Sequence, residues 1–281
     1  MKNALRCLVF DDQVSLTMID LTELVRQAVK LHSLSRSAAL TLGKVLSAVA
    51  FMSASLKETS GQVSVSLKGD GVGGTIGVSG DFALHIRGYI DEPKMEADER
   101  AVLGENGSLT VVRDDGYSRP FVGSCGFAEG GVDGIFEEYY RISEQLPTYF
   151  GSRIRFDKSD KVAFAGITVL QPLPFADPAT LDRLPKGEKL RAITEEIEKK
   201  GILQTAREYF AVTESRVEWK TAVYQCHCSR AYLAEVLASL GEEQMRQIVK
   251  EDGAVKAHCH YCNTDYLFKE EDIEKIFPHK V

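Results

Sequence analysis

Two closely spaced pairs of cysteines constrain the C-terminal part of this chain more than any other sequence feature. The motifs Cys226-His227-Cys228 and Cys259-His260-Tyr261-Cys262 are separated by residues 229–258 and contain four of the six cysteines. In a reducing compartment, paired cysteines serve metal or redox chemistry more often than structural disulfides. If all four sulfurs bind one ion, the two segments must fold against each other.

The spacing of these cysteines is typical of a zinc site. Zinc in proteins prefers four tetrahedral ligands, with Zn–S bonds of about 2.3 Å. A C-x-x-C turn presents two thiolates on one side of a tight turn, and a C-x-C segment does so more compactly. We therefore predict one Zn²⁺ ion per chain, bound by Cys226, Cys228, Cys259 and Cys262. An iron–sulfur cluster and metal-free thiols are the alternatives.

Three histidines flank the cysteines and are substitute ligands in principle: His227, His258 and His260. Four thiolates already complete the shell of a zinc ion, so we expect these histidines outside it. A zinc deaminase needs a His-x-Glu motif together with Pro-Cys-x-x-Cys. The chain has no His-x-Glu, and neither cysteine pair follows a proline.

The cysteine chemistry leaves two roles open for the metal. A purely structural zinc is the commoner use of a four-cysteine site. The alternative is a redox switch, because neighbouring cysteines in each motif are close enough to form a disulfide. A bridge between Cys226 and Cys228 would be strained, and strained bridges are labile. Because this C-terminal unit is small, metal binding would supply much of its folding energy.

Length and composition indicate a folded chain of about two domains. The chain has 281 residues, of which 44% are hydrophobic and 27% charged, and a domain typically has about 150 residues. The formal net charge is 34 − 41 = −7, and residues 221–281 carry 7 − 10 = −3. We therefore expect no nucleic-acid partner, because phosphate binders usually present basic faces.

Hydropathy predicts neither a membrane span nor a signal peptide. The longest uncharged run is Val162–Ala176, which contains Pro172 and Pro174 and is shorter than the ~20 apolar residues of a spanning helix. The apolar run after Arg6 is too short for a signal-peptide core. We expect a cytoplasmic protein without a membrane partner.

The first 177 residues predict a mixed α/β core. Asp20 and Ser35 are candidate caps for two helices that end near Leu31 and Leu56. Alternating hydrophobic residues predict strands at Asn3–Phe10, Val14–Ile19, Val63–Leu67, Ala83–Ile90, Leu109–Val112 and Val162–Leu170. A further helix is expected at Ile135–Gln145.

No sequence motif predicts an enzyme. The run Gly69–Gly74 matches G-x-G-x-x-G, but a strand-like segment follows it where a dinucleotide site needs a helix, so we interpret it as a turn. The chain has no Walker loop and no Ser/His/Asp signature. Cys7 and Cys125 are expected to be buried apolar residues and not nucleophiles.

The composition changes near Pro178. From there to Lys220 the chain is rich in charge and in helix formers, with thin apolar stripes, and Lys199-Lys200-Gly201 is a helix stop. We predict a core domain at 1–177, a metastable helical linker at 178–222 and a zinc-binding unit at 223–281. The last unit should contain helices at Arg230–Leu240, Glu242–Val249 and Glu270–Phe277 and two short strands, with α+β as the class of the whole chain.

The C-terminal sequence VYQCHCSRAYLAEVLASLGEEQMRQIVKEDGAVKAHCHYCNTDYLF resembles the zinc module of the redox-regulated heat shock protein 33 family. In that family a C-x-C motif is followed by a spacer about as long as residues 229–258, and then by a C-x-x-C motif. The spacer typically includes a segment like SLGEEQMRQIVKEDG. The segments GDGVGGTIGV, HIRGYI, GSLTVVRD and EEYYRISEQLPT resemble its core domain, so the resemblance extends over essentially the whole chain.

The resemblance implies an ATP-independent holdase that binds unfolding client proteins and is inactive while reduced and zinc-bound. Oxidation would form Cys226–Cys228 and Cys259–Cys262 disulfides, release zinc, and unfold the zinc unit together with the linker. The active form would bind clients, often as a homodimer. Two features depart from the family pattern: the segment TYFGSRIRFDKSD is bulkier and more basic, and Cys7 and Cys125 are additional thiols.

Overall fold

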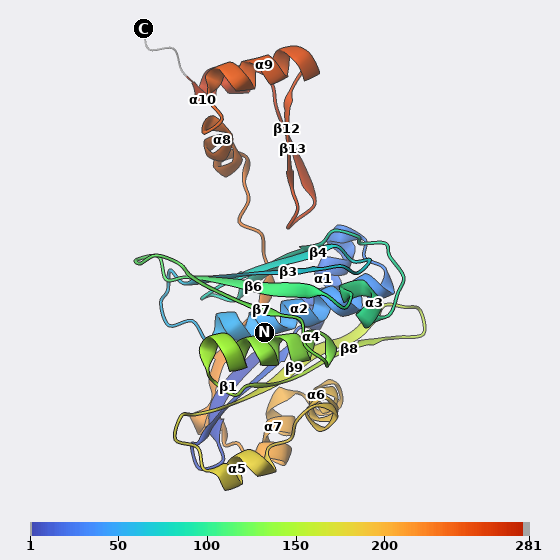
Figure 1. Cartoon of the computed structure of the whole chain (residues 1–281), viewed down its shortest axis with the longest axis vertical. Helices are drawn as coiled ribbons and strands as arrows, with labels where there is room; N and C mark the ends of the chain where they lie inside the picture. Colours follow the sequence, from blue (N-terminus) through green and yellow to red (C-terminus); the bar gives the residue numbers. More distant parts are fainter. Residues whose placement is uncertain (1, 278–281) are drawn as a thin grey trace. The chain divides into compact units, whose positions relative to one another are not determined.

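The computed structural model describes residues 2–277 and divides the chain into two compact units (Figure 1). The first unit extends to Gln225 and the second begins at Cys226. Helices and antiparallel sheets occur in both units, which confirms the α+β class.

The first unit contains two sheets. Its five-stranded sheet has the order β10-β1-β2-β9-β8, and its six-stranded sheet has the order β11-β5-β4-β3-β6-β7. All neighbouring strands are antiparallel except β11 and β5. The strands that form the bulk of the two sheets are β1 (Ala4–Val9), β2 (Val14–Asp20), β3 (Gln62–Gly69), β4 (Thr75–Asp81), β5 (His85–Ile90), β6 (Gly107–Asp114), β7 (Phe121–Gly126), β8 (Tyr149–Phe156) and β9 (Val162–Pro172).

Helix α2 (Arg36–Ala54) forms the centre of this unit. It lies between the two sheets with α1 (Thr22–His32) and α4 (Gly131–Tyr139), and most of its side chains are buried there (Figure 1). As predicted, Ser35 caps it by accepting a hydrogen bond from the Ala38 N–H. The expectation that Asp20 caps α1 was wrong by one residue: the cap position is Leu21, whose side chain makes no capping hydrogen bond. Asp20 precedes the cap, and its carboxylate accepts a hydrogen bond from the Thr22 N–H.

Within residues 2–277, helix α2 is long and apolar enough to cross a membrane. However, 83% of its most apolar window is buried inside the protein. Its composition therefore matches its position between two sheets, where every face of a helix must be apolar.

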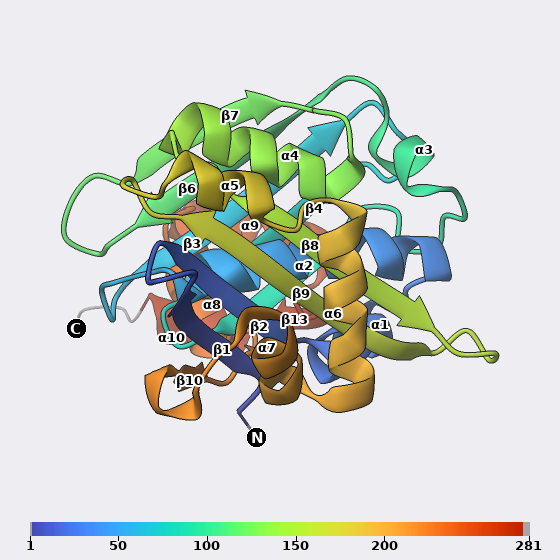
Figure 2. The same ribbon diagram turned by 90° about the horizontal axis from the view of Figure 1, so that it is seen from below.

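Three helices from the charged segment cover the outer face of the five-stranded sheet (Figure 2). They are α5 (Pro178–Arg183), α6 (Glu188–Lys200) and α7 (Ile202–Phe210). Their thin apolar stripes pack with Leu5, Leu16 and Met18 of the sheet in a second core. Helix α6 approaches β8 so closely at Gly151 that a Cβ atom there would lie 2.8 Å from the Leu190 backbone.

The chain after these helices contributes a short strand to each sheet. After the short turn η2 (Glu214–Arg216), β10 (Glu218–Lys220) pairs with β1, and β11 (Val223–Tyr224) pairs with β5. The Asn3 side chain bonds to both the N–H and the C=O of Ala222. Residues 178–225 therefore belong structurally to the first unit.

The motif Gly69–Gly74 is the connection between β3 and β4, as the turn interpretation predicted. The N–H groups of residues 71–73 in this turn donate hydrogen bonds to the C=O groups of residues 101–103 at the end of α3 (Glu99–Leu103). A Cβ atom at Gly71 would lie 2.3 Å from the Gly104 nitrogen, so this close backbone approach requires glycine.

The second unit is small. It contains α8 (Arg230–Ala238), α9 (Glu242–Asp252), the hairpin β12 (Val255–Cys259) and β13 (Thr264–Phe268), and α10 (Glu270–Ile276). Ser229 caps α8 by accepting a hydrogen bond from the Tyr232 N–H. Its buried hydrophobic core consists of Met245, Val255, Phe268 and Ile273.

Candidate metal centre

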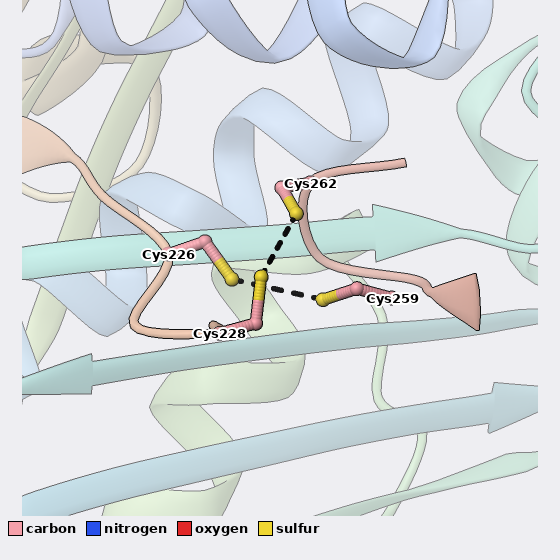
Figure 3. A group of neighbouring side chains, drawn as sticks. All are labelled: Cys226, Cys228, Cys259 and Cys262. Carbon is pink, nitrogen blue, oxygen red and sulfur yellow. Dashed lines mark hydrogen bonds between the residues drawn. The ribbon is translucent and has the colours of Figure 1, made fainter. Parts of the chain in front are cut away.

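Two short segments of the second unit present the four paired cysteines to one another (Figure 3). Cys226 and Cys228 lie in the irregular segment before α8, Cys259 ends β12, and Cys262 lies in the turn to β13. In this turn the N–H groups of Cys262 and Asn263 both donate to the Cys259 carbonyl, at 3.3 and 2.8 Å. The hairpin therefore holds the second pair on one side of a tight turn, as the C-x-x-C spacing predicted.

The four sulfur atoms form one compact group, all within 4.8 Å of one another. The Sγ atoms of Cys226 and Cys259 are 3.7 Å apart, and those of Cys228 and Cys262 are 3.2 Å apart (Figure 3). Both contacts join the two motifs, so the fold brings together cysteines that lie far apart in the sequence.

This arrangement fits a tetrahedral thiolate site. With Zn–S bonds of about 2.3 Å, the sulfurs of a tetrahedral site lie about 3.8 Å apart, which agrees with the separation of Cys226 and Cys259. Four soft sulfur donors suit zinc or an iron–sulfur cluster better than magnesium or calcium, which prefer oxygen ligands. The residues present can therefore hold a metal ion.

The environment makes the four thiols unequal. Burial raises the pKa of Cys226, and hydrogen bonding with neighbouring thiols raises it further. Burial also acts on Cys228, but hydrogen bonds from Tyr266 and Cys262 outweigh it and lower the pKa of Cys228 to about 7. The surroundings therefore favour the thiolate form of Cys228 and the neutral thiol form of Cys226.

Two hydroxyl groups support the sulfurs, and the sequence pattern did not single them out. The Tyr266 hydroxyl on β13 lies 3.3 Å from Cys228 Sγ, and the Thr264 hydroxyl accepts from Cys262 Sγ at 3.2 Å. Their positions depend on the register of β12 against β13, which pairs Cys259 with Thr264. The cysteine spacing alone does not give this register.

The compact group consists of cysteines and includes none of the three flanking histidines. His258 Nδ1 lies 2.7 Å from the Asp265 carboxylate, and its ring packs edge-on against that of His260. This agrees with the expectation that the histidines lie outside the ligand shell.

The two remaining cysteines lie in the first unit and are buried. Cys7 lies on β1 in the core beneath the linker helices, and Cys125 on β7 donates to the Ile135 carbonyl. Burial raises the pKa of each thiol to about 11. Both act as apolar core residues, as predicted.

Comparison with known proteins identifies relatives over nearly the whole chain. The model of the family described as Hsp33 protein matches residues 3–269. The 33 kDa chaperonin of Clostridium botulinum is 31% identical over 277 residues, with 95% of this chain and 94% of the relative covered. The 33 kDa chaperonin of Bacillus cereus is 32% identical over 286 residues, with 96% and 97% covered.

A solved structure has the same fold. The crystal structure of the 33 kDa chaperonin from Thermotoga maritima, a heat shock protein 33 homologue, matches with a TM-score of 0.83. The two chains are 26% identical, and the match covers 98% of this chain and 97% of that one.

The α+β fold and the C-terminal four-cysteine cluster are those of a heat-shock chaperone. The relatives are named as chaperonins, which is a non-enzymatic role. The chain belongs to the Hsp33 family. This confirms the family resemblance and, with it, a chaperone function that acts on client proteins.

Proposed function

We propose that this chaperone is a redox-regulated, ATP-independent holdase, inactive when reduced and zinc-bound. The observation that carries the proposal is the compact group of four sulfurs in a unit with a core of only four buried hydrophobic residues. A unit with so small a core depends on its metal for folding. Chemistry at the sulfurs therefore controls whether the unit folds.

In the reduced state, Cys226, Cys228, Cys259 and Cys262 bind one Zn²⁺ as thiolates. The metal supplies the electrostatic and covalent links that join the segment before α8 to the β12–β13 hairpin. The Tyr266 hydroxyl, 3.3 Å from Cys228 Sγ, would donate to that thiolate and hold it in position. Outer hydrogen bonds of this kind typically raise the affinity of a metal site.

Oxidation converts the thiols to two disulfides. For each pair, two thiols and one hydrogen peroxide give one disulfide and two waters; with hypochlorous acid the products are one disulfide, hydrogen chloride and water. We propose the pairs Cys226–Cys228 and Cys259–Cys262. Once the metal is lost and the unit unfolds, cysteines within one motif meet most often, because short loops close with the least entropy.

Unfolding of the second unit also affects the segment that precedes it. The chain reaches Cys226 through β10 and β11, which are only three and two residues long. We propose that residues 178–222 act as a metastable linker which detaches when residues 223–281 unfold. Detachment would uncover apolar side chains of the core domain (1–177) and of the linker. Leu16, Leu190 and Ile197 are examples, and all three are buried in the reduced state.

The exposed apolar surface would bind unfolding client proteins and prevent their aggregation, with a homodimer as the oxidised form. We place this activity in the cytoplasm, where reducing conditions keep the switch off until oxidative stress. The net charge of −7 argues against nucleic acid as a partner, and the buried position of α2 argues against a membrane partner.

Light scattering from a thermally aggregating client protein tests the proposal. The reduced, zinc-loaded protein should leave aggregation unchanged, and the same protein oxidised with peroxide under mild heat should suppress it. A Cys7→Ser/Cys125→Ser variant is the matched control, because it removes two buried thiols and should still switch. Equal suppression by both redox forms would show a chaperone whose metal is structural.

A further inference from the structure

Strand β7 forms one border of the six-stranded sheet, and within residues 2–277 it pairs with β6 alone (Figure 2). The sheet borders elsewhere in the first unit are shielded differently. The outward N–H groups of Phe150 and Ser152 on β8 donate to the side chains of Glu137 and Asp133. Strands β10 and β11 are only three and two residues long. Strand β7 is thus a six-residue border strand.

The register shows which backbone groups of β7 point away from the sheet. The N–H of Phe127 donates to the Gly107 carbonyl at 3.0 Å, directly opposite, so this pair is a hydrogen-bonded pair. Such pairs alternate along an antiparallel ladder, so the odd-numbered residues of β7 bond to β6. The residues whose N–H and C=O groups point outward are Val122, Ser124 and Gly126.

The outward groups lie beside exposed apolar side chains. Val122 is 61% exposed and Phe121 51%, and Tyr117 in the β6–β7 loop is 79% exposed. Ile142, in the π-helical turn η1 (Tyr140–Glu144), is 47% exposed, and its neighbour Ser143 donates to the Ser124 carbonyl over 3.5 Å. An incoming strand would replace this long hydrogen bond.

Strand β7 lacks the protection that border strands usually carry. Such strands are normally blunted by charged side chains, prolines or bulges. The sequence of β7 is FVGSCG, without charge or proline, and its pairing with β6 has a regular register. Pro120 and Arg119 lie just before the strand and limit pairing at that end only.

We propose that the free edge of β7 binds an extended apolar segment of an unfolding client by strand addition. The inference rests on the proposed holdase function and names the site and the chemistry of its client. Because the β7 edge is open in the reduced state too, it binds a client only weakly by itself, and stable binding also needs the apolar surface that oxidation uncovers. An extended backbone is the ligand that complements the outward N–H and C=O groups. Natively folded proteins have paired strands and do not offer one, whereas unfolding chains do, and the uncharged strand suits their apolar segments.

Val122→Pro and Val122→Ala separate backbone pairing from side-chain contact. Proline removes the outward N–H and leaves the β6 bonds intact, which a border strand tolerates; alanine shortens the side chain and keeps the N–H. The probe is fluorescent, reduced and carboxymethylated lactalbumin, which stays unfolded, titrated with each oxidised full-length variant. We expect Val122→Pro to weaken binding about tenfold and Val122→Ala less than about threefold.

Val122→Lys is the second variant, used if the proline variant does not fold, because an edge lysine also disfavours strand addition. Thermal unfolding of each reduced, zinc-loaded variant establishes that the core is intact. Wild-type affinity in Val122→Pro, or equal losses in the proline and alanine variants, would overturn the inference. The inference would also be overturned if Val122→Pro changed the sedimentation coefficient of the protein and left its client affinity unchanged. That result would mean that the β7 edge binds a second copy of the chain.

The wild-type protein separates this inference from the function on which it rests. If oxidised wild type binds the unfolded probe and Val122→Pro binds it equally well, the holdase function stands and the β7 site is wrong. If oxidised wild type neither binds the probe nor suppresses aggregation, both proposals are wrong.

Discussion

The ionisation of individual thiols determines which cysteines react. The thiolate is the nucleophile, so a thiol with a raised pKa reacts slowly near neutral pH. Cys7 and Cys125 have pKa values of about 11 because they are buried. At pH 8 only about one in a thousand such thiols is ionised.

We therefore expect iodoacetamide at pH 8 to label the four C-terminal cysteines well before Cys7 and Cys125 once metal removal has unfolded the second unit, because unfolding removes the burial that raises the pKa of Cys226. The rate at the two buried cysteines should rise with pH up to about 11. Peptide-level mass spectrometry measures both rates. Fast labelling of Cys7 or Cys125 in the folded core would contradict the burial that the structure gives them.

Tyr224 anchors the last strand before the cysteine cluster. Its hydroxyl donates to the Gly88 carbonyl at 2.8 Å and lies 3.0 Å from His32 Nε2, inside the first unit. Tyr224→Phe removes these bonds while keeping the ring, so we expect β11 to open more readily, by about 1–2 kcal/mol. The opening of β11 is measured by hydrogen exchange at the Val223 and Gln225 amides, which donate to the carbonyls of residues 84 and 86 and should exchange faster. Unchanged exchange there would show that the ring alone holds β11.

At the scale of elements, helix α6 is fastened to β8 by charged and polar contacts. The buried Asp133 carboxylate accepts from Ser152 and lies 3.3 Å from Arg191 of α6. The Thr194 hydroxyl donates to the Gly151 carbonyl at 2.7 Å. Arg153 and Arg155, in the basic segment noted in the sequence, pair with glutamates of α6. The unusual charge of this segment thus complements the glutamates that α6 places opposite it.

Arg191→Met should loosen α6 because it leaves buried Asp133 with one cationic partner fewer. We expect α6 amides to open about 1–3 kcal/mol more easily, measured by hydrogen exchange on the reduced, zinc-loaded protein. Burial already raises the pKa of Asp133. Loss of Arg191 would raise it further, so the difference from wild type should shrink as pH falls and Asp133 becomes protonated.

Lys199→Met is the matched control for Arg191→Met, on the same helix. Lys199 pairs with Glu196 at the surface, with most of its side chain exposed, and exposed pairs contribute little. We expect its α6 amides to exchange as in wild type. Equal effects of the two substitutions would mean that charge on α6, and not the buried partner, controls docking.

Sequence patterns predicted some elements better than others, for physical reasons. Helix α2 and its Ser35 cap follow from local chemistry, as does the Gly201 end of α6, where φ is 78°. Strand β7 was not predicted, because its burial alternates over only a few residues and it contains two glycines. Strands β10 and β11 are too short to carry a periodic pattern and form only through pairing with distant strands.

The four cysteines were found by spacing because two turns suffice to specify their geometry. Their hydroxyl partners were not found, because Tyr266 and Thr264 reach the cysteine sulfurs only through the register of the β12–β13 hairpin. The linker was predicted as marginal from its composition. Its helices nonetheless bury Leu190 and Ala206 completely, because the sheet beneath them supplies the apolar partner that the sequence segment itself lacks.

At the scale of the whole molecule, the two units differ in how their folding is supported. The first unit has two extensive hydrophobic cores, whereas the second has one core cluster of four buried residues and no buried residue on α8. We expect removal of metal with a chelator, under reducing conditions, to abolish amide protection in α8–α10 and β12–β13. Strands β2, β3 and β9 should keep theirs.

Hydrogen exchange monitored by NMR resolves the two regions, and re-addition of Zn²⁺ is the control that should restore the second unit. Simultaneous loss of protection in the second unit and in strands β2, β3 and β9 would contradict independent cores. Full retention in the second unit would show that its small core folds without metal, and would remove the physical basis for a metal-controlled switch.

Strand β1 acquires its outer neighbour late in translation. Ala4 lies opposite Lys220, and Asn3 bonds to Ala222, so more than two hundred residues must be synthesised before this border of the sheet is closed. Until then a nascent chain leaving the ribosome carries an open strand at its N-terminal end. A protein that protects other chains from aggregation therefore depends, during its own synthesis, on the rapid arrival of a distant segment.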